Sequence, residues 1–114
     1  MGLLTWKGGT LEAPLPPVLV SCGTLDSPNV LTVAWTGIVN TDPPMTYISV
    51  RPERFSFEIL RKTGEFVINL PTESLARAID FCGVRSGRDI DKIDACGLTL
   101  LPGETVQAPL VAQV

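Results

Sequence analysis

The sequence predicts a single domain over residues 1–114 that is mainly β, with antiparallel strands and flanking helices. Short runs of apolar and β-branched residues recur between proline, glycine, asparagine and aspartate clusters, which is typical of strands separated by turns. Helical spacing of apolar residues is confined to a few short segments. With 45% hydrophobic and 18% charged residues in a chain of 114, one packed core is expected.

The first half of the chain predicts an extended lead-in followed by strands. Three prolines near residues 14–17 keep the lead-in from forming a helix. Two apolar runs on either side of Asp26-Ser27-Pro28-Asn29 predict a β-hairpin over residues 18–35, with that tetrapeptide as its turn. Thr36-Gly37 interrupts the pattern, residues 38–39 continue it, and Pro43-Pro44 is expected to end any ladder. Residues 45–50 predict a third strand.

The second half alternates helices with strands. A helix is predicted at 53–63 because its apolar residues have helical spacing and Gly64 is a good stop. A second helix is predicted from about Thr72, a plausible N-cap, to Cys82-Gly83. The other predicted elements are a strand at 65–70, a helical turn at 90–97, and strands at 98–101 and 106–114. The last strand has no polar tail, so we expect either a truncated domain or a sheet completed by a second subunit.

Charge and hydropathy narrow the classes of partner. The formal charge is −3 and the nine basic residues are dispersed, so nucleic-acid binding is not expected. No apolar run reaches the ~20 residues needed to cross a bilayer, so no membrane partner is expected. The N-terminal residues do not have the pattern of a signal peptide, which predicts a cytoplasmic location.

Histidine and cysteine usage narrows the chemistry. The chain has no histidine, which excludes Ser-His-Asp and Cys-His catalysis within it. Cys22, Cys82 and Cys96 form no CxxC pair and are interpreted as free thiols, with no metal site. A redox sensor at Cys82 is disfavoured because a helix C-terminus has the wrong dipole for a thiolate. Any chemistry is therefore expected to come from a cofactor.

Two polar stretches suggest ligand binding. Residues 32–37 and 40–44 combine small, hydroxyl and glycine residues, which would expose backbone amides to a planar ligand; an ordinary strand with a glycine bulge is the alternative that the local pattern favours. Trp35 is either a core residue, which is the more common role of a strand tryptophan, or a ring-stacking residue. Residues 49–56 place Arg51 and Arg54 at a helix start, which suits a phosphate; the alternative is that these arginines pair with Glu53 or Glu58.

A third stretch, residues 83–89 followed by Lys92, is a glycine-containing loop with several basic side chains. Such a loop is able to close over an anion, although an ordinary surface loop is the safer local interpretation.

Taken together, residues 29–71 (NVLTVAWTGIVNTDPPMTYISVRPERFSFEILRKTGEFVINLP) and 76–93 (ARAIDFCGVRSGRDIDKI) resemble the flavin reductase-like family, which includes flavoredoxins. The resemblance implies an FMN-binding split β-barrel with Greek-key antiparallel strands, usually a homodimer with its site near the subunit interface. It also implies roles for particular positions. Those bordering the isoalloxazine ring are Thr32, Ala34, Trp35 and Thr36, with Asn40 and Thr41 also approaching the flavin. Those near the ribityl phosphate are Arg51 and Ser56, and the loop that completes the site contains Ser86, Arg88, Asp89 and Lys92. Family members continue past the point where this sequence ends, so a C-terminally incomplete barrel is expected.

The function implied is an FMN-binding oxidoreductase that passes electrons from NAD(P)H or a protein donor through the flavin. Two versions stay open, a reductase that oxidises NAD(P)H and a flavoredoxin that only carries electrons. The alternative from another class is a non-enzymatic module that dimerises without a working flavin. FAD in place of FMN also stays open.

Overall fold

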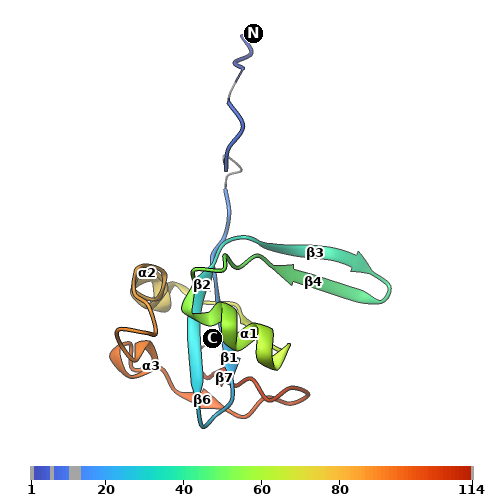
Figure 1. The fold of residues 1–114 in the computed structure, drawn as a ribbon. Helices are drawn as coiled ribbons and strands as arrows, with labels where there is room; N and C mark the ends of the chain where they lie inside the picture. Colours follow the sequence, from blue (N-terminus) through green and yellow to red (C-terminus); the bar gives the residue numbers. More distant parts are fainter. Residues whose placement is uncertain (1, 6, 11–13, 114) are drawn as a thin grey trace.

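The computed structural model describes residues 2–5, 7–10 and 14–113. The described strands are β1 (Val18–Gly23), β2 (Pro28–Val33), β3 (Thr36–Thr41), β4 (Pro44–Ile48), β5 (Val67–Asn69), β6 (Leu100–Leu101) and β7 (Leu110–Val111). The helices are α1 (Phe55–Thr63), a 3₁₀ turn (Glu73–Leu75), α2 (Ala76–Val84) and α3 (Lys92–Ala95). All strand pairs are antiparallel: a sheet in the order β2-β1-β5, a hairpin of β3 and β4, and a pair of β6 and β7 (Figure 1). The predicted mainly β class with flanking helices is confirmed.

The hairpin predicted over residues 18–35 is present as β1 and β2, and it forms the centre of the molecule. Its register runs from Val18 opposite Val33 to Gly23 opposite Pro28. The predicted turn at residues 26–29 is shifted, because Pro28 already begins β2 and the turn is formed by residues 24–27. Proline is compatible with the first residue of β2, which is an edge strand. Gly23 has a φ of 82°, and a side chain there would also collide with the carbonyl of Ser27.

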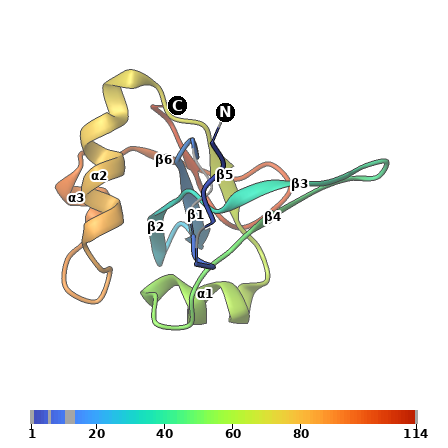
Figure 2. The same cartoon turned by 90° about the horizontal axis from the view of Figure 1, so that it is seen from above.

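The two faces of this sheet carry separate clusters of buried side chains. Along β1 the residues alternate between the faces, as strand geometry requires. One cluster contains Val18, Val20, Leu31 and Val33. The other contains Leu19, Val30, Leu75, Cys82, Leu98 and Val111, and here α2 and α3 cover the sheet (Figure 2). Helix α1 lies across β1 and β2 (Figure 1).

The hairpin of β3 and β4 projects away from the rest of the domain (Figures 1 and 2). The expectation that the double proline ends the ladder is wrong: Pro44 pairs with Thr41 as the first residue of β4. Proline cannot donate a backbone hydrogen bond, but it is tolerated as the first residue of a strand, where the ladder does not need that bond. The strand register shifts between Ile38 and Asn40. The irregularity therefore lies after Gly37, where the sequence suggested a glycine bulge, and not at Gly37 itself.

Helix α1 ends where predicted, at Gly64, whose φ of 67° is the left-handed conformation of a C-cap. The predicted second helix begins as a 3₁₀ turn and becomes α-helical only from residue 76. Thr72 precedes it but makes no capping hydrogen bond, because its Oγ1 lies 2.9 Å from the Oγ of Ser74 instead.

The predicted strands of the second half are shorter than expected. Residues 65–70 contribute only β5, and residues 106–114 contribute only β7 in the described part of the chain. β7 is paired with β6, and Val111 is buried. The Asn69 side chain fixes this arrangement: its Nδ2 donates to the Leu19 carbonyl (3.0 Å) and to the Ser21 Oγ (3.1 Å), and its Oδ1 accepts from the Val111 N–H (3.0 Å). The terminal strand is thus not the unpaired edge that the sequence suggested.

Within the described residues, no helix combines the length and the apolar character that a bilayer span requires.

Candidate functional site

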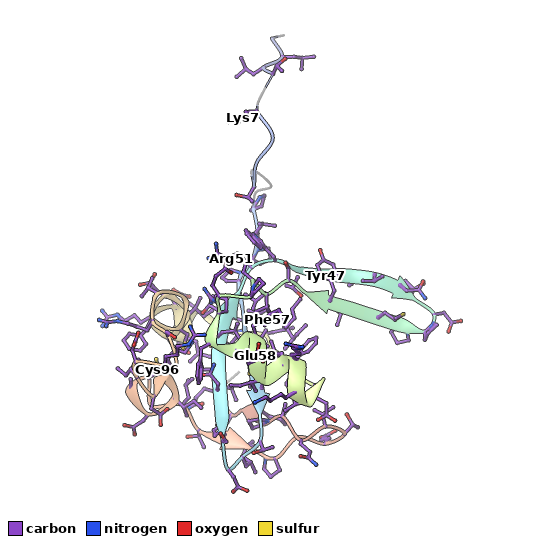
Figure 3. All side chains as sticks on the ribbon, in the orientation of Figure 1. Lys7, Tyr47, Arg51, Phe57, Glu58 and Cys96 are labelled. Atoms are coloured by element: carbon purple, nitrogen blue, oxygen red, sulfur yellow. The ribbon has the colours of Figure 1, made fainter. Side chains whose placement is uncertain are left out.

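A hollow of about 370 Å³ lies where the chain leaves β2 and where it leaves β4. The Ser49 N–H donates to the Trp35 carbonyl (2.9 Å), which holds these two exits together. The lining residues are Leu31, Thr32, Val33, Ala34, Trp35, Ser49, Val50, Arg51 and Arg54. Three of the four predicted ring-bordering residues, Thr32, Ala34 and Trp35, therefore meet the predicted phosphate-side Arg51 at one place, although they are separated along the chain. Arg51 lies at the junction of the sheet with the projecting hairpin (Figure 3).

This first hollow has an apolar floor and a polar rim. Leu31 and Val33 belong to a buried core cluster, whereas Arg51 is exposed. Trp35 is 42% exposed, so the interpretation of this tryptophan as a core residue is wrong. A broad aromatic face that remains open beside apolar residues suits the stacking of a planar ring.

A second, smaller hollow of about 160 Å³ adjoins the first, since Leu31 and Arg54 line both. Its other walls come from the start of α1, the end of α2, the loop that follows α2 and the first residue of α3. They are Glu53, Phe55, Ser56, Gly83, Val84, Arg85, Ser86, Gly87, Arg88 and Lys92. The fold thus brings the predicted Ser56, Ser86, Arg88 and Lys92 together around one cationic space.

Lys92 is the most unusual cation of this hollow. Its side chain is only 3% exposed, and its Nζ makes one hydrogen bond, 3.4 Å long, to the Cys82 carbonyl. Burial lowers the pKa of Lys92; the neighbouring Cys82 acts in the opposite direction, and the Arg54 charge lowers it further. An ammonium group has three donors, so a buried ammonium with one long bond and a positive neighbour is poorly compensated. A bound anion would satisfy it, and a dianionic phosphate fits this donor set.

The loop between α2 and α3 is held against the start of α1. The Arg88 Nη1 donates to the Glu53 carbonyl (3.1 Å), and its guanidinium lies 5.7 Å from the centre of the Phe55 ring. Gly87 permits this contact: a Cβ there would lie 2.5 Å from the Phe55 ring and 2.7 Å from the Asn29 Oδ1. The loop is therefore held against α1 at Gly87 and Arg88, while residues 83–85 and 88–90 are exposed, as the alternative of a surface loop expects.

The start of α1 also suits an anion. Arg54 is its N-cap residue, and no side chain caps the first-turn amides. In the described part of the chain, Arg51 and Arg54 form no ion pair with Glu53 or Glu58, and Glu58 pairs instead with Arg61 at 3.7 Å. The charge-pairing alternative for these arginines is therefore not what the structure contains.

Other predicted residues are already engaged within the protein. The Thr32 Oγ1 donates to the Ile79 carbonyl (2.6 Å), and the Thr36 Oγ1 donates to the Tyr47 carbonyl (2.7 Å). Ser56 is buried, and its Oγ accepts a hydrogen bond from the Asn29 Nδ2 (2.6 Å). Ligand contacts from the two threonines are therefore expected through backbone groups rather than hydroxyls.

Four predicted residues are not among those lining either hollow: Thr36, Asn40, Thr41 and Asp89. Asn40 and Thr41 are exposed at the far end of β3, and the Asn40 Nδ2 donates to the Pro43 carbonyl (3.1 Å). Asp89 is exposed in the loop after α2 and is not among the residues lining either hollow. Their contact with a ligand stays a prediction. Conversely, Arg54, which the local pattern of residues 49–56 places beside Arg51 as a phosphate donor, lines both hollows.

Comparison with known proteins gives a consistent result. The family model described as "Flavin reductase like domain" matches residues 11–114. The chain is 34% identical to the flavoredoxin of Desulfovibrio vulgaris (Miyazaki F), covering 98% of this chain and 62% of that one with a TM-score of 0.88. It is 28% identical to an FMN-binding domain of a flavin reductase-like enzyme from Shewanella baltica OS155, covering 85% of this chain and 51% of that one with a TM-score of 0.79.

The curated relatives are longer. An uncharacterised protein of Pyrococcus abyssi is 29% identical over 107 residues, which is 94% of this chain and 61% of that protein. A putative flavin reductase from Shewanella frigidimarina that contains a split-barrel domain shares the fold at 24% identity, with a TM-score of 0.76 over 87% of this chain and 50% of that one. The split-barrel fold and the match over almost the whole chain lead to one conclusion: the chain belongs to the flavin reductase-like family.

Proposed function

We propose that the chain is the FMN-binding part of an oxidoreductase of the flavin reductase or flavoredoxin type. The observation that carries the proposal is the pair of adjoining hollows that share Leu31 and Arg54. One has an apolar floor and an exposed tryptophan, and the other has a buried, poorly compensated ammonium. A ligand with a flat ring at one end and a phosphate dianion at the other matches both.

In this proposal the chain's own residues bind and orient, and the cofactor supplies electron transfer. Backbone groups of residues 32–36 and the Trp35 side chain border the ring. Arg54, Arg88 and Lys92 hold the phosphate, assisted by the amides at the start of α1. No acid or base is required of the chain for hydride transfer from NAD(P)H, which agrees with the absence of histidine from it.

The decisive test compares FMN with riboflavin, which has the same ring and no phosphate. Titration of the full chain, followed by quenching of flavin fluorescence, is expected to show tighter binding of FMN. Arg54→Ala should weaken FMN binding about 10- to 150-fold, since a lost charge-assisted hydrogen bond costs about 1.5–3 kcal/mol. Arg77→Ala is the matched control, because Arg77 is exposed on α2 and lines neither hollow. Equal affinity for the two flavins, or no binding of either, would contradict the proposal.

The identity of the electron donor distinguishes a reductase, which oxidises NAD(P)H, from a flavoredoxin, which only carries electrons. Stopped-flow mixing of the FMN-loaded protein with NADH and with NADPH is expected to bleach the flavin band if the protein is a reductase. A band that persists with both donors would favour the flavoredoxin version, in which a redox protein supplies the electrons. A chain that acquires no yellow band and no thermal shift with FMN would favour the non-enzymatic module.

We further propose that the working form is a homodimer. The arm of β3 and β4 leaves Ile38 (82%), Val39 (61%) and Met45 (53%) exposed, and a gathering of exposed apolar side chains on one hairpin is typical of an interaction surface. Asn40 and Thr41 lie on the same arm, away from the hollows of their own chain. Insertion of the arm into a second copy would bury the apolar side chains and supply these two residues to that copy's site. Light scattering is expected to give a dimer that Ile38→Asp dissociates; a wild-type monomer at all concentrations would contradict this.

A cytoplasmic location stays a prediction of the sequence.

A further inference from the structure

Two of the cysteines that are distant in the sequence lie next to one another in the fold. Cys82 is in α2, Cys96 is the residue after α3, and their Sγ atoms are 4.0 Å apart. Nothing in the spacing of fourteen residues indicates this pair, because the usual short dithiol motifs place the cysteines on one turn. The contact arises only because α2 and α3 pack together over the same face of the sheet, where Cys96 is labelled in Figure 3.

The two thiols differ in accessibility. Cys82 is completely buried, whereas Cys96 is partly exposed. The third cysteine, Cys22, is buried in β1, and its Sγ lies 3.7 Å from the Asn29 carbonyl, an ordinary core position. Cys22 therefore serves as an internal reference for a thiol with no sulfur neighbour.

A bond between Cys82 and Cys96 would close a loop over the segment that forms one wall of the cationic hollow. Residues 83–95 include Arg88 and Lys92, and the Lys92 ammonium already contacts the carbonyl of Cys82. Bond formation would bring the sulfurs from 4.0 Å to about 2.05 Å. Rotation of a cysteine side chain about χ1, with a small shift of α3, supplies such a movement.

We propose that Cys82 and Cys96 form a reversible intramolecular disulfide that fastens α3 to α2 and constrains the loop between them. The oxidant is a low-molecular-weight disulfide such as oxidised glutathione. The accessible Cys96 attacks one sulfur of that disulfide as a thiolate, forming a mixed disulfide and releasing one thiolate. Cys82 then attacks the Cys96 sulfur, forming the protein disulfide and releasing the second thiolate. The two protons from the cysteines end on the two released thiols, so the protein loses two electrons and the glutathione disulfide gains them.

The second step needs the Cys82 thiolate. Burial raises the pKa of Cys82 to about 12, with the Cys96 thiol adding to the rise, whereas the Lys92 charge acts to lower it. The buried partner is therefore the slow one, and the partly exposed Cys96 is where oxidation begins. Because the Lys92 charge favours the Cys82 thiolate, the second step is expected to be faster in wild type than in Lys92→Met.

The test uses the full chain equilibrated with reduced and oxidised glutathione at stepped ratios, followed by acid quenching, alkylation in denaturant so that the buried thiols also react, and mass spectrometry. The oxidised protein should be lighter by two hydrogens and retain one alkylatable thiol, which peptide mapping should assign to Cys22. Oxidised Cys22→Ala should form the same bond and retain no alkylatable thiol, and Cys96→Ser should not form the intramolecular bond. Circular dichroism checks that each variant is folded. Three alkylatable thiols at the most oxidising ratio, or a disulfide that includes Cys22, would overturn the proposal.

The effect on the loop is measured separately. Amide hydrogen exchange over residues 83–95 should be slower in the oxidised form than in the reduced form, and unchanged in Cys96→Ser. A disulfide that forms without altering this exchange would overturn the constraint on the loop. The consequence for the cofactor rests on the proposed function: FMN affinity should differ between oxidised and reduced wild type. Failure of FMN to bind in either state would contradict the proposed function, whereas equal FMN affinity in both states would contradict only the coupling.

Discussion

Replacing Lys92 with methionine is expected to change stability and FMN affinity in opposite directions. Methionine has a similar length and no charge, so it fills the buried channel of the lysine stem without the ammonium. In the ligand-free protein the ammonium is 3% exposed and has a single 3.4 Å hydrogen bond. Replacing poorly compensated buried charges with apolar side chains of similar volume is neutral or stabilising by up to about 1–4 kcal/mol. A gain of 1 kcal/mol corresponds to about 4–8 °C in Tm for a domain of this size.

The pH dependence of this gain follows from the lowered pKa of Lys92. Burial places the folded-state pKa of Lys92 below its ordinary value of 10.5. At pH values between the lowered pKa and 10.5, Lys92 is protonated in the unfolded chain and largely neutral in the folded protein. The free energy of unfolding of the wild-type protein therefore rises with pH over this range. The stability advantage of Lys92→Met should therefore be largest near neutral pH and shrink as the pH approaches 10.5. Urea titrations of both proteins at several pH values measure it.

The loss of affinity is worked from the same contacts. The two remaining donors of the Lys92 ammonium are available to a phosphate, and a lost charge-assisted bond costs about 1.5–3 kcal/mol. FMN affinity should fall about 10- to 150-fold, while riboflavin affinity should be unchanged. Calorimetric titration with both flavins, with Arg77→Ala as control, provides the measurement. A Lys92→Met protein that is less stable at pH 7 and binds FMN as wild type does would refute the reasoning.

Three other predictions concern single sites. Gly87→Ala should destabilise the protein and weaken FMN binding, because the new Cβ would lie 2.5 Å from the Phe55 ring. Gly83→Ala in α2 introduces only ordinary van der Waals contacts and should stabilise the protein by up to about 1 kcal/mol. Thermal melts in which both variants shift Tm in the same direction would contradict this. Burial raises the pKa of Cys82 from 9.0 to about 12, so above pH 9 the folded state retains a proton that the unfolded chain loses, and the free energy of unfolding should fall as the pH rises. Cys82→Ala should flatten that slope between pH 9 and pH 12. Asn69→Ala removes three buried hydrogen bonds through which Asn69 joins β7 to β1, and it should lower the free energy of unfolding by at least about 2 kcal/mol in urea titration. A decrease of less than about 0.5 kcal/mol would show that β7 is held by packing alone.

Much of the fold is predictable because it depends on local signals. The hairpin of β1 and β2 follows from two β-branched runs around a turn, and the end of α1 follows from Gly64. The errors occur where pairing partners decide the outcome. The apolar residues of 106–114 predict a strand, but among the residues of this segment that the structure describes only Leu110–Val111 pair with a partner strand, β6. Pro44 belongs to a ladder because its missing N–H is not required there.

The site divides in the same way. By itself the sequence determined the chemical inventory: apolar and small residues at 32–36, arginines at a helix start, a basic loop near residue 88, and no histidine. Those are properties of short segments, and a reader of the chain can find them. Only the tertiary structure decided that the segments adjoin through Leu31 and Arg54, that Lys92 is buried with one hydrogen bond, and that Asn40 and Thr41 lie on a projecting arm. The tertiary structure likewise decided that Cys82 and Cys96 lie next to one another. Such relations depend on the packing of elements far apart in the chain, and burial and distance have no local signature in sequence.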